Sequence, residues 1–180
     1  MDNRYVKIFA SGSKAPLKAT PGHFATNHSH INYYLDMTTL KTRLSEAQEV
    51  AKHLAERFLF DKVVDTIVCL EGTQVIGAYL AEELTRAGVL STNAHKTIYV
   101  ITPEYNSQMV FRENILPMVH GKNVVILTAV VTTGLSLNKS IEAIQYYGGK
   151  LQSAAAVFST LDELNGCPIT SIYSPEDVTD

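Results

Sequence analysis

The sequence predicts an α/β fold: a mainly parallel, twisted sheet with helices on both faces. Short apolar runs rich in β-branched residues alternate with segments whose apolar residues recur at helical spacing. The runs are continuously apolar, which is typical of parallel strands that helices cover on both sides. The 180 residues are 46% hydrophobic and 18% charged, so they suit one globular domain with a substantial core. We therefore expect one compact domain, preceded by an N-terminal segment of different character.

That N-terminal segment, residues 1–37, is expected to be irregular, because prolines and glycines interrupt it repeatedly. Two short extended pieces are predicted within it, at 22–26 and 31–37. We interpret residues 1–37 as a hood or hairpin segment and residues 38–180 as the α/β domain.

The elements of the α/β domain follow from its hydrophobic pattern. Strands are predicted at 64–70, 97–101, 123–128, 151–158 and, at the edge of the sheet, 169–173. Helices are predicted at 40–60 with a cap from Thr38 or Thr39, at 72–87 with Gly88 as its stop, and at 137–147, where Tyr146 and Tyr147 are expected to cover the sheet. Residues 102–122 show low periodicity and contain two prolines, and connections of that length are often functional.

Composition excludes several classes of protein. The net charge of −3 and the pI near 6.1 argue against a nucleic-acid binder or a binder of anionic membranes, either of which normally carries a basic face. No apolar stretch approaches the length of a membrane span. The two cysteines, Cys69 in an apolar run and Cys167 in a loop, form no CxxC pair, so a metal or disulfide scaffold is not predicted. A reducing, cytoplasmic compartment fits best.

One segment has the character of a phosphate-binding loop. VVTTGLS follows a predicted strand and precedes a predicted helix, so its backbone N–H groups and the positive end of the helix point toward the turn. Gly134 can take a positive φ, and the hydroxyl groups add donors without a lysine. The alternative is a plain strand-to-helix turn with a threonine cap. The candidate phosphate-binding residues are Val131, Thr132, Thr133, Gly134, Leu135 and Ser136.

The same region resembles a known family. NVVILTAVVTTGLSLNKSIEAI is similar to the nucleotide-sugar loop of type I phosphoribosyltransferases, in which an apolar strand, two acidic residues and two mostly apolar residues precede Thr-Thr-Gly and a Ser or Thr. GHFATNHSHINYYLDM resembles the N-terminal hairpin of orotate phosphoribosyltransferases. The segment 65–88 resembles the family's strand, pyrophosphate loop and helix, with the loop at 70–73. The resemblance covers about residues 22–178.

The resemblance implies a reaction. The family transfers ribose 5-phosphate from phosphoribosyl pyrophosphate (PRPP) to a nitrogenous base, here of the pyrimidine type, and releases pyrophosphate with the help of Mg²⁺. It also implies a homodimer. By this resemblance the 5′-phosphate contacts fall on Thr132, Thr133, Gly134 and Ser136, and the ribose and pyrophosphate region falls on Thr128, Ala129, Glu71, Gly72 and Thr73.

The chain departs from the family at its charged positions. The acidic pair falls on Thr128 and Ala129, of which only the threonine can hydrogen-bond a hydroxyl. The mobile loop that carries several cations in orotate enzymes corresponds to 101–122, with only Arg112 before Lys122, and the hairpin lysine falls on Asn27. The catalytic residues are therefore unknown, with Arg112 and Glu71 as candidates.

Three hypotheses remain open. The first is a diverged phosphoribosyltransferase that uses Mg²⁺. The second is a catalytically inactive protein that binds a nucleotide or phosphosugar, needs no cofactor and regulates a partner. The third is a dimer subunit that uses the fold only for assembly. In the first two, the ligand is a small phosphate compound such as PRPP, a nucleoside monophosphate or ribose 5-phosphate.

Several other residues have two interpretations. Tyr33 and Tyr34 either stack on a base or pack in an interface, and packing is favoured. Tyr105 and Arg112 either close over a ligand from the 102–122 segment or lie in solvent. Glu71 either touches a ligand or metal or is a carboxylate stabilised near a helix N-terminus. Three histidines match no standard metal spacing and are interpreted as surface or subunit-contact residues: His23, His28 and His30.

Overall fold

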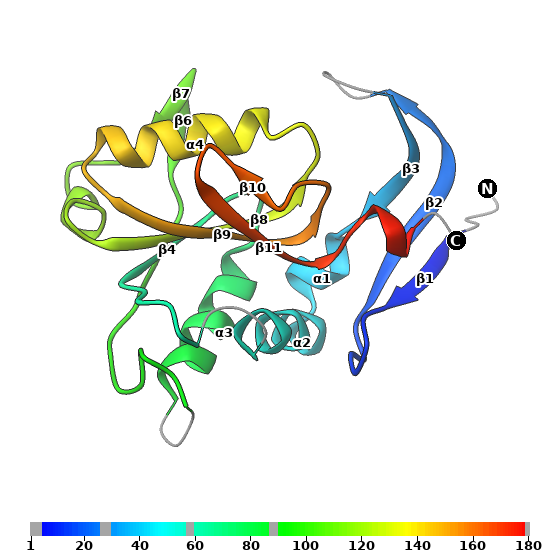
Figure 1. Ribbon diagram of the computed structural model, residues 1–180, viewed down its shortest axis with the longest axis horizontal. Helices are drawn as coiled ribbons and strands as arrows, with labels where there is room; N and C mark the ends of the chain where they lie inside the picture. Colours follow the sequence, from blue (N-terminus) through cyan, green and yellow to red (C-terminus); the bar gives the residue numbers. More distant parts are fainter. Residues whose placement is uncertain (1–4, 26–29, 57–59, 87–89, 179–180) are drawn as a thin grey trace.

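A central six-stranded sheet with helices on both faces forms most of the molecule, and a separate three-stranded sheet lies at its N-terminal side (Figure 1). This is a computed structural model, which describes residues 5–25, 30–56, 60–86 and 90–178, and for residues 23–25, 30 and 31 it describes the backbone alone. The predicted α/β class is confirmed.

The central sheet is parallel except at one edge. Its strand order is β10 (Glu163–Leu164), β11 (Cys167–Tyr173), β9 (Lys150–Ser159), β8 (Asn123–Val131), β4 (Thr66–Cys69) and β5 (Tyr99–Ile101). Only β10 pairs antiparallel, with β11. The 169–173 strand was therefore wrongly predicted at the edge, because the two-residue β10, too short to leave a pattern, lies outside it. The carboxyl ends of β4 and β8 lie at one rim of the sheet.

Helices cover the two faces unequally (Figure 1). α1 (Thr38–Thr42), α2 (Leu44–Leu54) and α3 (Gln74–Thr85) lie on one face, and α4 (Leu135–Tyr146) lies on the other. Each face has its own buried apolar cluster. Within the described residues, none of these helices is long and apolar enough to span a bilayer.

The first helical region differs from its prediction. A single helix over 40–60 was expected, but the backbone is extended at Arg43 (φ −83°, ψ 122°), which separates α1 from α2. The cap from Thr38 or Thr39 was also wrong. The Asp36 carboxylate accepts the Thr38 N–H at 3.0 Å, and the Thr39 hydroxyl instead donates to Glu46 at 3.0 Å. The predicted stop at Gly88 lies outside the described residues.

The predicted N-terminal hairpin is confirmed, but it belongs to a three-stranded sheet, so the segment is not irregular as expected. β1 (Val6–Phe9), β2 (Pro16–Ala25) and β3 (His30–Asp36) pair antiparallel. Alternate residues of β2, Leu17 and Ala19, are buried, and the lysines beside them concealed this period of two. The Tyr173 hydroxyl accepts the Ala10 N–H at 3.0 Å and lies 3.2 Å from the Ala15 carbonyl oxygen, which ties this sheet to the central one.

The segment 102–122 also contains regular structure. β6 (Glu104–Asn106) and β7 (Gln108–Val110) form a hairpin, which turns at Ser107 with a φ of 58°, and η2 (Leu116–Met118) follows. Met109 and Phe111 are buried in the apolar cluster that also contains residues of α4. The sequence did not indicate these strands, because strands of three residues are too short to show a period.

Asp65, which precedes β4, hydrogen-bonds with Asn123, the first residue of β8. Its Oδ2 accepts the Asn123 backbone N–H and the Asn123 side-chain amide, both at 2.8 Å, and its Oδ1 lies 3.2 Å from Lys96 Nζ. Burial acts to raise the pKa of this carboxyl, but the hydrogen bonds from Asn123 and Lys96 outweigh it and hold the pKa below its ordinary value.

Asp65→Asn is expected to lower the free energy of unfolding at pH 7 by about 1.5–3 kcal/mol, the range for hydrogen bonds to a charged group. Because the pKa of Asp65 is lower in the folded state, its carboxylate stabilises the fold at pH values above its unfolded pKa of about 4. This stabilisation disappears as the pH falls through the folded-state pKa. The difference between variant and wild type should therefore shrink toward pH 3 in urea titrations. An equal difference at pH 7 and pH 3 would contradict this role.

Candidate functional site

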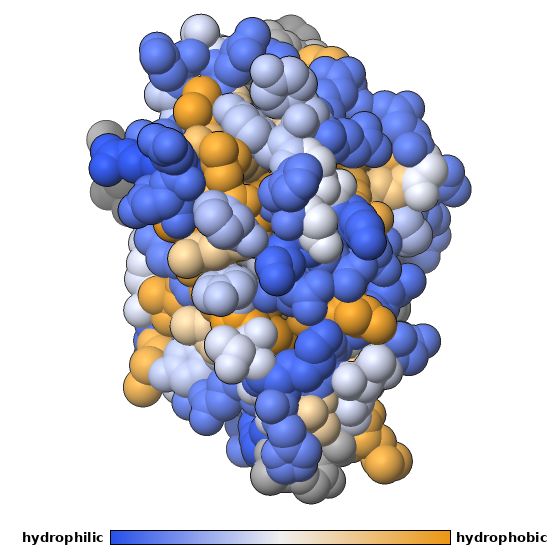
Figure 2. Space-filling view, turned by 90° about the vertical axis from the view of Figure 1, so that its left-hand side faces the viewer, coloured by the Kyte–Doolittle hydropathy of each residue, from blue (hydrophilic) through white to orange (hydrophobic). Residues whose placement is uncertain are grey.

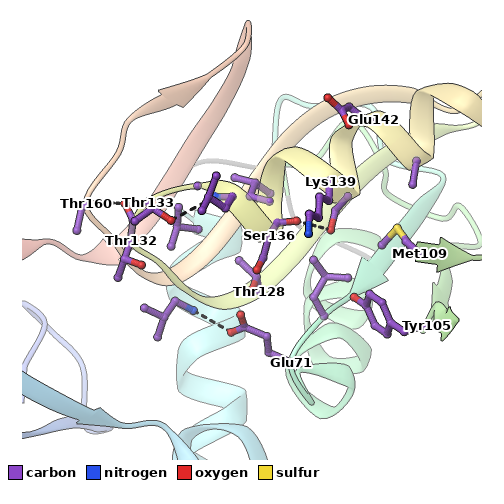
Figure 3. A pocket seen from close by; sticks show the side chains of 18 of the residues that line it. Glu71, Tyr105, Met109, Thr128, Thr132, Thr133, Ser136, Lys139, Glu142 and Thr160 are labelled. Carbon is purple, nitrogen blue, oxygen red and sulfur yellow. Dashed lines mark hydrogen bonds between the residues drawn. The ribbon is translucent and has the colours of Figure 1, made fainter. Parts of the chain in front are cut away.

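A cavity of about 1420 Å³ opens at the carboxyl ends of β4 and β8. It lies between β3, the end of β4, the β8–α4 turn, α4 and the β6–β7 hairpin, and Figure 3 shows the side chains that line it. Of the sequence-predicted site residues, those that line it are Glu71, Thr128, Val131, Thr132, Thr133, Gly134, Leu135 and Ser136. The predicted loop and the end of β4 thus meet at one rim.

The predicted phosphate loop has the backbone that its sequence suggested. β8 runs to Val131, a turn follows, and α4 begins at Leu135. Gly134 is the N-cap residue with φ 80° and ψ 5°, in the left-handed region that favours glycine. A Cβ there would lie 3.0 Å from Leu164 Cδ2 and 3.1 Å from Leu161 Cδ1. The left-handed conformation therefore favours glycine at this position, and a Cβ would also crowd these two leucine side chains.

The loop at Val131–Ser136 offers hydrogen-bond donors but contains no lysine or arginine. The first i→i−4 bond of α4 runs from the Asn138 N–H to the Gly134 carbonyl at 2.8 Å, so the N–H groups of the first turn have no partner within the helix. The Leu135 N–H meets only the Thr133 hydroxyl, at 3.4 Å. Thr160 holds the outer side of the loop, donating from its hydroxyl to the Thr132 carbonyl and from its N–H to the Val131 carbonyl. This arrangement suits an anion at a helix N-terminus.

The two residues at the family's acidic positions lie on opposite sides of β8. Thr128 is almost fully buried, yet it lines the cavity. Ala129 is 2% exposed and belongs to the apolar cluster beneath α2 and α3. Position 129 is therefore part of the core. Of these two residues, only Thr128 offers the cavity a polar group.

Glu71 supplies the carboxylate nearest to this rim. It has a left-handed backbone (φ 56°) next to Gly72 (φ 72°). Its carbonyl accepts Lys41 Nζ at 2.9 Å, and its carboxylate accepts the Val130 N–H at 3.3 Å, a bond drawn in Figure 3. These contacts hold the carboxylate across the ends of β4 and β8.

Gly72 and Thr73, the remaining predicted members of this region, do not line the cavity. Thr73 is fully buried, and its hydroxyl donates to the Leu70 carbonyl at 2.7 Å, so it stabilises the turn itself.

The cations are not where the sequence suggested. Arg112 is not among the residues that line the cavity, and its Nε lies 2.6 Å from Glu104 Oε1, a contact that raises the pKa of the guanidinium. Lys139 was missed by sequence reasoning, although its spacing of three from Ser136 places it on the same side of α4. Among the described residues that line the cavity, Lys139 is the only lysine or arginine, against two acids, Glu71 and Glu142.

Tyr105 lines the cavity, in line with one of its two interpretations, whereas two tyrosines at the end of α4 differ from their prediction. Tyr146, the last residue of α4, and Tyr147, its C-cap residue, also line the cavity, so they do not simply cover the sheet. Tyr33 and Tyr34 line its opposite end, and Tyr33 packs edge-on against Phe158 with ring centres 6.0 Å apart.

The residues at the rim do not fit a magnesium ion. Mg²⁺ takes octahedral oxygen ligands, with carboxylates as its usual protein donors. Here Glu71 lies at the rim, and its carboxylate already accepts the Val130 N–H. In the part of the chain that the structure describes, no three His, Cys, Asp or Glu side chains gather to hold a metal. Asn27 and His28 lie outside the described residues.

Comparison with known proteins rests on structure. No family model and no curated protein matches the sequence. Among solved structures, orotate phosphoribosyltransferase of Mycobacterium tuberculosis matches at TM-score 0.62 and 16% identity, covering 91% of this chain and 93% of that one. UMP synthase of Leishmania donovani matches at TM-score 0.63 and 18% identity, covering 89% of this chain and 34% of that one. Adenine phosphoribosyltransferase of Leishmania donovani matches at TM-score 0.61 and 10% identity, covering 91% and 78%.

These likenesses, together with the parallel sheet and the β8–α4 loop, define the class: the chain has the type I phosphoribosyltransferase fold. In particular, the orotate enzyme of Mycobacterium tuberculosis is matched over nearly its whole length, which confirms the orotate-type resemblance at the level of the fold. The same enzyme has been solved with inorganic phosphate and with PRPP, at TM-scores of 0.57 and 0.54 to this chain. At these identities, the chemistry has to be argued from the cavity itself.

Proposed function

We propose that the chain binds a phosphorylated ribose compound, a nucleoside 5′-monophosphate or ribose 5-phosphate, without catalysing its transfer. The observation that supports this is the pairing of an intact donor loop at Thr132–Ser136 with a rim that lacks the acidic pair. The loop neutralises a phosphate through N–H and hydroxyl groups and the helix dipole. No metal is required for that contact.

The missing groups are those that act in the transition state. Transfer from PRPP separates an oxocarbenium-like ribose from an anionic leaving group, so metal ions and cations stabilise the charge. Here the described residues that line the cavity supply one ammonium, from Lys139, and two carboxylates. Losing one charge-stabilising group of this kind costs about 3–4 kcal/mol of the barrier. A binding or regulatory protein is therefore the function that this cavity supports best.

A second candidate is the transferase itself, with PRPP, a pyrimidine-type base and Mg²⁺. It is favoured by the fold and by Glu71, a carboxylate held at the rim from β4 rather than from β8. Magnesium-dependent release of pyrophosphate from PRPP with any base would support this candidate. No release with orotate, uracil or adenine is the result we expect.

Ribose 5-phosphate is expected to raise the melting temperature of the protein, and ribose is expected to leave it unchanged. The reason is that a ligand bound to the folded state stabilises it according to its concentration relative to Kd, and the loop recognises the phosphate. Thermal denaturation with each compound measures this. If no phosphate compound shifts the melting temperature, the binding proposal is wrong. The remaining hypothesis is then a dimer subunit that uses the fold only for assembly.

We further propose a homodimer in a reducing, cytoplasmic compartment. Both cysteines are free and buried, and burial raises the pKa of the Cys69 thiol to about 12 and that of Cys167 to about 11. Such thiols stay protonated and unreactive. Two unpaired cysteines suit a reducing environment, in which disulfides are rare. Light scattering measures the oligomeric state, and a monomer would contradict the dimer.

A further inference from the structure

The turn of the β10–β11 hairpin consists of an asparagine followed by a glycine. The two strands pair antiparallel with Leu164 opposite Cys167, so Asn165 and Gly166 alone form the turn. Both have a left-handed backbone, with φ of 49° and 80°, which is typical of an Asn-Gly turn between two strands. Asn165 is the only asparagine in the sequence that a glycine follows. The hairpin forms the outer edge of the central sheet, beside α4 (Figure 1).

This turn is open to water. Asn165 and Gly166 are both exposed, and a Cβ placed on Gly166 would meet nothing within 4 Å. On the side of the molecule where α4 ends, hydrophobic residues form small, separate patches among hydrophilic ones (Figure 2). Surfaces that bind a protein usually expose a broad apolar patch. That side therefore gives no reason to expect a partner that would shield the turn.

The Gly166 nitrogen is well placed to react with the neighbouring side chain. Its residue has no Cβ that would hinder the approach of the nitrogen to another group. Among the described residues, the Gly166 N–H donates no hydrogen bond in the turn. The Asn165 side chain is held away from it by one hydrogen bond, which Nδ2 donates to Asn138 Oδ1 on α4. This bond lies at the surface, where water competes for both groups, so it opens readily.

We propose that Asn165 is a site of spontaneous deamidation, in which the Gly166 nitrogen is the nucleophile. Hydroxide takes the proton of the Gly166 N–H, and the nitrogen attacks Cγ of Asn165. The bond from this nitrogen to Cγ forms, the Cγ–Nδ2 bond breaks, and Nδ2 leaves as ammonia after taking a proton from water. One water molecule then opens the five-membered imide. The products are an ammonium ion and either aspartate or isoaspartate, and nothing is oxidised or reduced.

Deamidation would weaken the contact between the hairpin and α4. An oxygen would replace the Asn165 donor and face the Asn138 Oδ1 acceptor, so their hydrogen bond would be lost. Asn138 also donates its Nδ2 to Glu142 Oε1 at 3.2 Å, so reversing its amide would break that second bond. Isoaspartate adds one carbon to the backbone of a two-residue turn, which disturbs the pairing of Leu164 with Cys167. We therefore expect a less stable hairpin.

Mass spectrometry of the wild-type protein tests the site. The folded protein is kept warm at pH 8 for several weeks, and its peptides are then mapped. We expect the peptide that contains Asn165 to gain one mass unit before any other asparagine peptide does, and to do so faster at higher pH.

Asn106 is the internal control for this measurement. It is exposed and precedes Ser107, where the β6–β7 hairpin turns, and the serine Cβ hinders the same attack. A faster mass gain at Asn106 would overturn the proposal. So would an Asn165 that stays intact in the folded protein, and the chain unfolded in urea, treated in parallel, then measures how far the fold protects it.

Two variants separate the reaction from its structural effect. Asn165→Gln is expected to keep its mass, because the longer side chain would have to close a less favourable six-membered ring, and a mass gain in its peptide would contradict attack at this position. Asn165→Asp reproduces one product. It is expected to lower the melting temperature by about 2–4 °C, the shift for the loss of about one hydrogen bond in a domain of this size. Aged wild type that has gained the mass unit but melts like fresh protein would refute the weakened contact with α4.

Discussion

Thr133→Asp is expected to lower the affinity for ribose 5-phosphate by about a thousandfold. The new carboxylate would stand within the loop where the phosphate is proposed to bind. Two unit charges about 4 Å apart repel by about 4 kcal/mol at an effective dielectric constant of 20. The fold should not suffer, because Thr133 is exposed and its hydroxyl already meets the Leu135 N–H, a contact that an aspartate near a helix N-terminus also makes. Calorimetric titration measures the loss.

Thr133→Asn provides the matched control for charge. Asparagine has nearly the same size as aspartate and also suits a helix N-terminus, so it should retain affinity within about tenfold of wild type. Equal affinities for the Asp and Asn variants would show that the phosphate lies elsewhere, and the loop would then be only a strand-to-helix turn.

Ala129→Asp is expected to lower the free energy of unfolding by about 3–5 kcal/mol, the range for an uncompensated charge in a core. Ala129 is 2% exposed and lies in the apolar cluster beneath α2 and α3. Urea titration measures the change. Restoring an acidic residue at position 129 should thus destabilise the fold and is not expected to restore transferase activity.

Thr128→Asp is the comparison variant, because position 128 borders the cavity and a carboxylate there can be hydrated. We expect a loss of about 1 kcal/mol, within the usual range for single substitutions. Equal destabilisation by the two variants would contradict the different surroundings that the structure gives to these neighbours.

The features that were predictable from sequence are those encoded locally. The apolar runs of β4, β8 and β9 and the left-handed Gly134 each follow from a few consecutive residues. The N-terminal sheet was not predictable in the same way. The alternation of Leu17 and Ala19 with polar residues gains meaning only once the burial of one face is known. The three-residue strands of the hairpin are below the length at which a period shows.

The cavity was only half predictable for a similar reason. Thr132 to Ser136 form one contiguous loop, whereas Lys139 and Tyr146 reach the cavity through helical spacing and Tyr105 through a hairpin folded onto α4. Arg112 was proposed because few cations were left in its segment, but its partner Glu104 lies on the neighbouring strand, a pairing that the sequence does not reveal. The roles of Glu71 and Arg112 in any chemistry stay predictions.

Calorimetric titration with ribose 5-phosphate and with PRPP, each with and without Mg²⁺, decides whether the loop alone recognises the ligand. We predict that both compounds bind, that PRPP has no advantage, and that Mg²⁺ changes neither affinity. Tight binding of PRPP only in the presence of Mg²⁺ would contradict a metal-free phosphate site. It would mean that Glu71 and the ligand's own phosphates assemble a metal site, and the transferase would become the better assignment.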